Sequence, residues 1–265
     1  MIELVMVIVL MGIVGGMVVS FMKPPIDAYF AVIRRAALTD QADTVARRVS
    51  RDIRTALPNS LRTPNSNCLE FIPTKTGGRY RAGDLTADDG TALDFSDTDS
   101  AFNILGSNSA LAADQRIAVN DLIAVYNLGI VDADAYNSDN TTSVTAIGAE
   151  TGAPLETPLT IADKKFLLES PGRRFHVIPA AEKVVAYVCS GGKLYRTASS
   201  VFYAESSASV CPTSGPVLAH KVSHCSFDYS GSDVRRNALV TLVLQFTDSA
   251  ETVSLHQDVH VNNTP

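Results

Sequence analysis

The sequence predicts an α+β protein in which one long N-terminal helix packs on a mainly antiparallel β-sheet domain with long loops. Two observations carry this prediction. Residues 1–57 contain an uncharged apolar run and then a stripe of apolar residues at helical spacing. From about residue 67, short runs rich in Val, Ile, Leu, Tyr and Phe alternate with Gly, Asn, Asp and Ser. Because helix and strands segregate along the chain, a parallel α/β sheet is not expected.

Composition indicates a folded chain and excludes one class of function. The 265 residues are 46% hydrophobic and 19% charged, which is enough apolar side chain for a sizeable core. Residues 1–57 hold seven Lys/Arg against five Asp/Glu, whereas residues 58–265 hold fifteen against twenty-three. No region is basic enough for the phosphate contacts that drive nucleic-acid binding, so we expect no nucleic-acid partner.

The apolar run covers residues 4–22 and contains no charged side chain. As a helix it would span about 28 Å, close to the hydrocarbon thickness of a bilayer. It is longer than the apolar segment of a secretory signal peptide, so a transmembrane helix is favoured over a signal peptide and over a buried core helix. The side chains expected to face lipid or neighbouring helices are Leu4, Val5, Val7, Ile8, Leu10, Ile13, Val18 and Phe21.

Two charge features do not fit a plain membrane anchor. Glu3 lies at the edge of the run, where a carboxylate costs several kcal/mol unless it reaches the interface or a partner. The first basic residues, Lys23, Arg34 and Arg35, all follow the run. By the positive-inside rule, that order would place the bulk of the chain in the cytoplasm.

The helical pattern continues beyond the run to Leu57, with apolar residues at three- and four-residue steps and charged residues between them. Pro24 and Pro25 are expected to kink or locally unwind the helix, and Pro58 to end it. The first half of the helix is therefore apolar on all sides, and the second half is amphipathic. We divide the chain into this helix, residues 1–57, and a globular β-rich domain, residues 58–265.

Eight strands are expected in the globular domain. They are residues 68–72, 122–127, 174–178, 184–189, 193–197, 222–229, 239–247 and 252–262. Ser190-Gly191-Gly192 should join two of them in a hairpin, and residues 248–251 should turn a longer one. Residues 83–115 and 132–163 show weak periodicity, so we expect long surface loops there with at most one short helix.

The four cysteines are Cys68, Cys189, Cys211 and Cys225, and no pair has the C-x-x-C spacing of a zinc or redox site. Their even number, beyond a membrane segment, suggests one or two disulfides in an oxidising periplasm. Three connectivities are possible. We favour Cys189–Cys211 with Cys68–Cys225, because the first would close a loop around one hairpin edge; free buried thiols are the alternative.

No metal, cofactor or catalytic site is expected. His220 and His224, like His256 and His260, are four residues apart in or beside expected strands, which places each pair roughly 13 Å apart, too far to bind one ion. The acidic loop residues that could ligate calcium are Asp88, Asp89, Asp94, Asp97, Asp99, Asp132, Asp134 and Asp139. They lack the glycine and terminal glutamate of an EF-hand loop, so solvated loops are favoured. The common hydrolase, P-loop, zinc-protease and dinucleotide-binding motifs are also absent, so no enzyme activity is expected.

The opening Met1-Ile2-Glu3-Leu4-Val5-Met6-Val7-Ile8-Val9-Leu10 resembles the N-terminus of type IV pilins and the related pseudopilins. In that family a prepilin peptidase removes a short basic leader from the precursor. The matching glutamate, here Glu3, is thought to neutralise the N-terminal amine of a neighbouring subunit. The resemblance therefore implies a partner for Glu3. It also implies a leader, its cleavage-site glycine and two further residues before Met1. The basic leader would supply the positive charge on the cytoplasmic side, so the globular domain could lie in the periplasm.

Later segments resemble the minor pilin-like proteins of the mannose-sensitive haemagglutinin pilus. These segments are residues 23–30, 56–60, 77–81, 169–176 and 258–263. The resemblance implies a low-abundance subunit that starts or caps a fibre, with a single span in the inner membrane and its globular domain in the periplasm. Its partners would be other pilin and minor pilin subunits. The alternatives are a minor pseudopilin of a type II secretion system and a membrane-anchored periplasmic binding domain that never enters a fibre.

Overall fold

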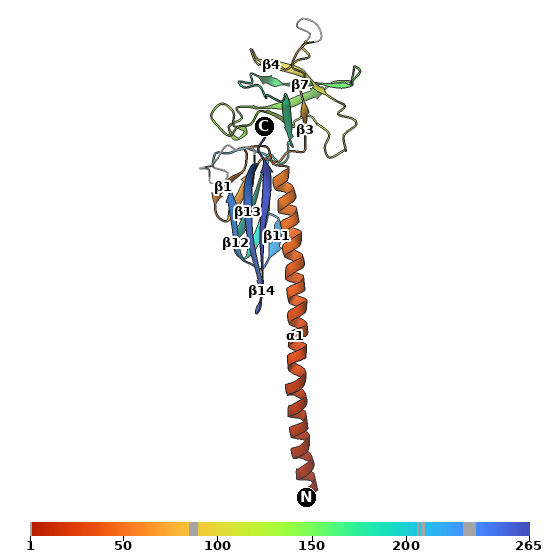
Figure 1. The fold of residues 1–265 in the computed structure, drawn as a ribbon, viewed down its shortest axis with the longest axis vertical. Helices are drawn as coiled ribbons and strands as arrows, with labels where there is room; N and C mark the ends of the chain where they lie inside the picture. Colours follow the sequence, from red (N-terminus) through yellow and green to blue (C-terminus); the bar gives the residue numbers. More distant parts are fainter. Residues whose placement is uncertain (1, 85–89, 206, 208–209, 230–236) are drawn as a thin grey trace.

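The computed structural model describes residues 2–84, 90–205, 207, 210–229 and 237–265, and it confirms the expected α+β class. Helix α1 (Ile2–Arg54) is continuous and projects away from the folded part of the chain (Figure 1). Pro24 and Pro25 lie inside it without interrupting it, so the helix does not unwind there, and a kink at these prolines stays a prediction. Each proline removes only one i to i−4 hydrogen bond. The remaining backbone hydrogen bonds on both sides keep this long helix continuous.

The C-terminal half of α1 lies against two antiparallel sheets, and together they form the part we call the helix lobe. The five-stranded sheet has the order β1 (Arg62–Asn65), β2 (Cys68–Phe71), β9 (Val184–Ser190), β10 (Lys193–Ser199), β11 (Val217–His220). The three-stranded sheet has the order β12 (Val222–Tyr229), β13 (Asn237–Asp248), β14 (Glu251–Asn262). As Figure 1 shows, the long β13–β14 hairpin runs alongside α1.

In the core of the helix lobe, buried residues recur at helical spacing on α1 and at every second residue on strand β13. The buried residues of α1 are Leu38, Ala42, Val45, Ala46, Val49, Ser50 and Ile53, which recur at three- and four-residue steps. On β13, alternate residues from Ala238 to Phe246 are buried, as expected for a strand with one face in the core. The apolar stripe of α1 and these strand faces belong to one continuous hydrophobic cluster. The expected packing of the amphipathic half-helix on the sheet is therefore confirmed.

A second lobe, the distal lobe, is inserted between β2 and β9. It contains one six-stranded antiparallel sheet with the order β3 (Thr76–Arg79), β8 (Arg174–Ile178), β5 (Leu122–Val125), β6 (Thr141–Ile147), β7 (Glu156–Lys164), β4 (Asp99–Leu105). It also contains the short 3-10 helix η1 (Ala135–Asn137). Since β2 and β9 pair directly in the helix lobe, the insertion leaves and re-enters that lobe at adjacent points. The distal lobe has its own hydrophobic cluster, a division that the sequence pattern does not indicate.

All eight expected strands are present, and β12 begins and ends where the sequence predicts. The expectation of long loops over residues 83–115 and 132–163 is wrong, because β4, β6 and most of β7 lie there. These strands are rich in Thr, Ser, Asp and Asn, and only part of each is buried. Their strand conformation depends on pairing with neighbours that are distant in sequence, which local periodicity does not report.

Two disulfides are present, but the favoured connectivity is wrong. The structure pairs Cys68 with Cys211 and Cys189 with Cys225. Cys68 is aligned with Val188 across the β2–β9 pair, so the next residue, Cys189, points to the opposite face of the sheet. Cys189 therefore faces the core between the two sheets, where it meets Cys225, while Cys68 meets Cys211 on the outer face.

The two lobes meet at a small apolar junction with polar contacts around it. The junction consists of Leu57, Ile72, Leu122, Ala124, Ala135 and Ile178, contributed by both lobes. Beside it, Lys75 Nζ lies 2.5 Å from Asp121 Oδ2. The buried Asn127 side chain donates to the Pro58 carbonyl at 2.7 Å and accepts from the Ala135 amide at 2.8 Å. These buried contacts fix the distal lobe on the helix lobe.

Candidate functional site

The projecting half of α1 is the first candidate functional surface. None of the described residues before Leu38 is buried, although most of them are apolar. Leu4 is 69% exposed and Phe21 79% exposed, and exposed apolar side chains lie all around the helix. The helix is long and apolar enough to cross a membrane. An apolar surface of this extent, continuous over the protruding stretch, marks contact with lipid or with other helices.

The side chains expected to face lipid or neighbouring helices all lie on this surface. They are Leu4, Val5, Val7, Ile8, Leu10, Ile13, Val18 and Phe21, and each is exposed. Glu3 lies in the first turn of α1 and is exposed as well. No described residue forms an ion pair or hydrogen bond with Glu3. A partner for this carboxylate would therefore come from outside the described chain.

Polar contacts add to the apolar packing of the other half of α1 on the helix lobe. Arg35 binds Glu251, at the start of β14, through Nη2 at 2.7 Å and Nε at 3.1 Å. Deeper in the interface, Asp52 Oδ2 accepts hydrogen bonds from the Tyr187 hydroxyl at 2.7 Å and from Arg196 Nε at 2.9 Å. Burial, together with the negative charge of Asp52, raises the pKa of Tyr187, so this phenol stays protonated and donates. The projecting half is thus a rod with a fixed base.

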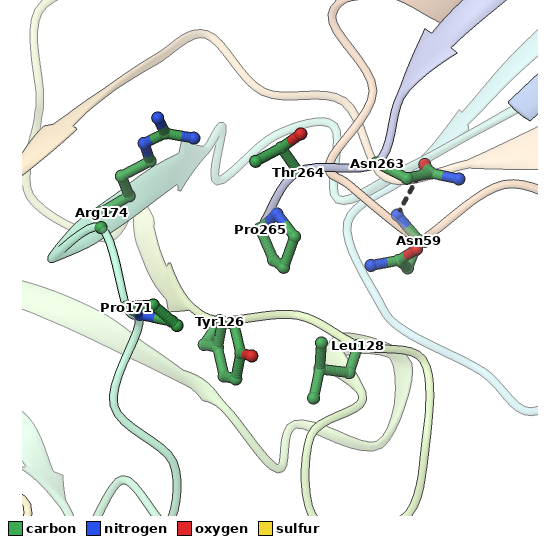
Figure 2. A pocket seen from close by; sticks show the side chains of 9 residues that line it. Asn59, Tyr126, Leu128, Pro171, Arg174, Asn263, Thr264 and Pro265 are labelled. Atoms are coloured by element: carbon green, nitrogen blue, oxygen red, sulfur yellow. Dashed lines mark hydrogen bonds between the residues drawn. The ribbon is translucent and has the colours of Figure 1, made fainter. Parts of the chain in front are cut away.

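The second candidate surface is a pocket of about 480 Å³ between the two lobes, shown in Figure 2. Its lining residues are Asn59, Tyr126, Leu128, Pro171, Gly172, Arg174, Asn263, Thr264 and Pro265. Tyr126, Leu128 and Pro171 form an apolar wall, Pro265 lies opposite them, and the Arg174 side chain extends away from Pro171 at one side of the view (Figure 2). The volume is within the range of small-molecule sites.

Three residues at this pocket have a left-handed backbone conformation. Asn59 and Tyr126, which line it, have φ of 59° and 51°, and Arg173, beside the lining residue Gly172, has φ of 54°. The left-handed conformation is uncommon for a bulky side chain such as Tyr or Arg, and it costs on the order of 1 kcal/mol or more. Strained residues of this kind concentrate at functional sites.

The pocket is assembled from segments that are distant in sequence. Residues 56–60, 169–176 and 258–263 each contribute lining side chains, and the 77–81 segment pairs with the 169–176 segment through β3 and β8. Four of the five segments on which the resemblance to minor pilin-like proteins depends therefore meet at this one place. Sequence reasoning singled out these segments but could not place them together, because they come from both lobes.

Beside the pocket, two arginines lie directly opposite each other. Arg79 of β3 and Arg174 of β8 are register partners in the antiparallel pair, and both are exposed. Like charges at such positions repel. Within the described chain neither guanidinium has a carboxylate partner, whereas Arg62, Arg81 and Arg196 each bind one. The uncompensated positive charge is concentrated in a domain that is acidic overall.

A second, smaller pocket of about 300 Å³ adjoins the arginine pair. It is lined by Gly77, Gly78, Arg79, Arg174, Phe175 and His176, so Arg174 borders both pockets. Gly77 has no room for a side chain, since a Cβ there would lie 2.8 Å from the Phe175 carbonyl oxygen. His176 Nε2 is buried and has no hydrogen-bond partner in the described chain. Burial, reinforced by the charge of Arg174, lowers the pKa of His176 to about 4.

A third cluster, Arg62 with Glu70 and Tyr136, has a structural explanation. Arg62 Nη2 lies 3.0 Å from Glu70 Oε1, and its Cζ lies 3.8 Å from the centre of the Tyr136 ring. Burial raises the pKa of Glu70, and the charge of Arg62 partly offsets this effect. The cluster joins β1 and β2 of the helix lobe to η1 of the distal lobe. Its role is therefore to position the two lobes at their junction.

The described residues contain no group of three or more His, Cys, Asp or Glu side chains that could hold a metal ion. Of the acidic residues considered as calcium ligands, Asp88 and Asp89 lie outside the described residues. Asp94 and Asp99 make local turn contacts, accepting hydrogen bonds from the amides of Ser96 and Ala101. These contacts account for the two carboxylates without an ion.

The fold and these surfaces define a general class of protein, namely an elongated chain with one helix able to span a membrane and a globular part with two disulfides. Disulfides indicate an oxidising compartment for the globular part. No protein-family model, curated protein or solved structure matches this chain. Its function is therefore inferred from its own residues and geometry.

Proposed function

We propose that this chain is a minor pilin-like subunit that takes part in starting or capping a type IV pilus of the mannose-sensitive haemagglutinin type, by assembly rather than catalysis. The observation that carries the proposal is the exposed apolar rod of α1 with a single carboxylate, Glu3, at its tip. Before assembly, the rod would rest in the inner membrane with the globular domain in the periplasm, where the two disulfides form. The prepilin peptidase would act on the full-length precursor.

In this proposal, assembly transfers the rod from lipid into a bundle of like helices. Lipid tails are as apolar as the helix, so the transfer gains little from the hydrophobic effect and depends on close packing. Gly12, Gly15 and Gly16 leave open space on the rod, since a Cβ at each would meet nothing within 4 Å. Small residues spaced four apart, such as Gly12 and Gly16, let neighbouring helices approach closely.

Glu3 would set the register of this packing through a charge pair with the amine of a neighbouring subunit. In an apolar bundle, a carboxylate without a partner is costly, so a subunit placed out of register by a turn would be disfavoured. The fixed base of α1 on the helix lobe helps, because a rigid rod transmits the register of its tip to the globular domain. Glu3 is thus an assembly residue in this proposal.

The test compares two single carboxylate removals on the same helix. Glu3→Ala should leave membrane insertion intact, because it makes the rod more apolar, but should reduce surface pili by about tenfold or more through loss of the charge pair. Asp27→Ala is the matched control, since Asp27 is an exposed carboxylate outside the apolar run, and should leave both properties unchanged. Membrane fractionation measures insertion, and sheared-fibre yield measures assembly.

The outcomes separate this proposal from its alternatives. Normal piliation with Glu3→Ala would remove the pairing role and favour a membrane-anchored periplasmic binding domain. If deleting the gene spares surface pili but blocks secretion of periplasmic proteins, the chain is a minor pseudopilin of a type II secretion system. Loss of pili on deletion, with Glu3→Ala reproducing that loss, supports the proposal.

A further inference from the structure

We propose that the interlobe pocket and the arginine pair beside it form a binding site for a carboxylated sugar, of the uronic acid type. The site consists of Arg79 and Arg174 for the carboxylate, the apolar wall of the pocket for the sugar ring, and nearby polar atoms for hydroxyl groups. This inference is independent of the role proposed for α1, because the site lies entirely in the globular part, beyond the base of the helix (Figure 1).

The arginine pair supplies the first recognition element. Two guanidinium groups on directly opposed strand residues repel each other, and an anion placed between them turns this repulsion into two charge-assisted contacts. A guanidinium binds a carboxylate through two parallel N–H donors, which fixes both position and orientation. Arg79 and Arg174 are exposed and have no competing carboxylate among the described residues. A ligand can therefore reach both without breaking an existing ion pair.

The apolar wall supplies the second element. Because Arg174 borders both pockets, a ligand whose acid group binds the arginine pair extends its body into the larger pocket, toward Tyr126 and Pro171. Aromatic rings and prolines pack well against a flat C–H surface, such as a pyranose face. A bare inorganic anion would leave this wall unused. The wall is what favours an organic acid over phosphate.

Unpartnered polar atoms supply the third element. Within the described chain, the side-chain oxygens of Tyr126, Thr264 and Asn59 have no hydrogen-bond partner, and each of these residues lines the pocket. Asn59 Nδ2, by contrast, is already used, donating to the Asn127 carbonyl at 2.9 Å. Free oxygen atoms around an apolar wall match a ring that carries several hydroxyl groups. A simple fatty or aromatic acid has no hydroxyl groups to donate hydrogen bonds to these oxygens.

His176, which lines the smaller pocket, adds a fourth group. Its Nε2 is buried without a partner, which costs free energy unless a ligand or water satisfies it. Because burial and Arg174 keep this imidazole neutral near pH 7, Nε2 offers a hydrogen bond without adding to the positive charge. A ligand oxygen or hydroxyl group that reaches past the arginine pair would satisfy it.

The experiment measures binding of D-glucuronate to the full-length chain in detergent micelles by titration calorimetry. Glucose has the ring without the charge, and inorganic phosphate has the charge without the ring. We expect saturable binding of glucuronate, and binding about tenfold weaker or less for the other two probes. Equal affinity for phosphate would reduce the site to a general anion site, and equal affinity for glucose would remove the role of the arginines. Either result, or no saturable binding of glucuronate, overturns the proposal.

Variants test the named residues. Arg79→Gln and Arg174→Gln should each weaken glucuronate binding about tenfold or more. They should also raise the melting temperature of the ligand-free protein, because each removes a like-charge contact. Arg116→Gln removes an exposed arginine elsewhere in the distal lobe and should leave glucuronate binding unchanged; because Arg116 Nε donates to the Leu111 carbonyl at 3.0 Å, its melting temperature should not rise. Unchanged affinity in both arginine-pair variants would contradict the proposal.

A further variant covers the case in which loss of an arginine disturbs folding. Gly172→Ala keeps all charges, but its Cβ would lie 3.1 Å from Arg174 Nε, so the Arg174 side chain must shift by a few tenths of an ångström. We expect weaker glucuronate binding with an unchanged content of secondary structure. Full affinity in Gly172→Ala together with full affinity in Arg79→Gln would overturn the assignment. None of these variants touches α1, so each should still enter pili, which separates failure of this inference from failure of the proposed function.

Discussion

At the scale of single residues, the chain places charge where its surroundings oppose it, in two different ways. Glu3 lies at the tip of an apolar rod, and Arg79 faces Arg174 across two strands. The opposed arginines do not stabilise the isolated subunit. In the functions proposed above, an opposite charge from outside makes each arrangement favourable, a neighbouring amine for Glu3 and a ligand carboxylate for the arginines.

His176 gives a residue-scale prediction for pH dependence. Its pKa falls from an ordinary 6.5 to about 4 in the folded protein, because of burial and the charge of Arg174. Between these values the unfolded chain binds a proton that the folded chain does not, so stability falls as the pH drops from about 6.5 to about 4. At 1.36 kcal/mol for each pH unit, His176 accounts for a loss of about 3 kcal/mol over the window.

The measurement is urea unfolding of the wild type and of His176→Gln at pH 7 and at pH 4. Other titrating groups are common to both proteins, so the difference between their pH dependences isolates His176. The Gln variant should lose about 3 kcal/mol less than the wild type on acidification. Parallel losses in the two proteins would show that His176 is already protonated or already exposed in the folded state.

At the scale of secondary structure elements, a strand could be predicted from the sequence when its own residues determine its conformation. It was missed when pairing with strands distant in sequence determines that conformation. Strand β9 is mostly buried and β13 buries alternate residues, and the Val, Leu and Phe residues of β9, β12 and β13 follow patterns that identify these strands locally. For β4 and β6 the pattern is weak, since their pairing partners and their half-buried surroundings decide their conformation. The predicted disulfide connectivity was wrong for the same reason, because it depends on the register of β2 and β9, which places Cys68 and Cys189 on opposite faces of the sheet.

The rod of α1 gives a prediction at the element scale. Gly16→Leu should preserve membrane insertion, since Leu is more apolar and a better helix former than Gly. It fills the open surface that Gly12 and Gly16 leave for a neighbouring helix, so incorporation into pili should fall by about tenfold or more.

Val14→Leu is the matched control for this change. Val14 lies on the opposite side of the helix from both glycines, because two residues correspond to about 200° of rotation. Sheared-fibre yield and membrane fractionation, performed on both variants, provide the readouts. An equal loss of incorporation in both would mean that bulk anywhere on the rod is excluded, and the glycine face would lose its assigned role.

At the scale of the whole molecule, the chain is a helix lobe with a second lobe inserted between two paired strands. The helix lobe contains α1, both disulfides and the β13–β14 hairpin, which are the parts that the proposed assembly requires. The distal lobe has its own hydrophobic cluster and contributes Arg79, Arg174 and Tyr126 to the interlobe pocket. The pocket draws on both lobes and on segments separated by some two hundred residues, so only the folded topology reveals it.

This architecture predicts that the two activities can be separated by excision. Residues 74–182 would be replaced by a short Asn-Gly turn, with Ile72→Thr added because Ile72 loses its partners Leu122 and Ile178 at the junction. Phe71 and Val185 are register partners at the ends of β2 and β9, so a tight turn can join these strands. We expect the excised protein to form Cys68–Cys211 and Cys189–Cys225, insert in the membrane and enter pili, while binding no glucuronate. Peptide mapping without reduction identifies the disulfides, and failure of the excised protein to form them would show that the helix lobe needs the distal lobe to fold.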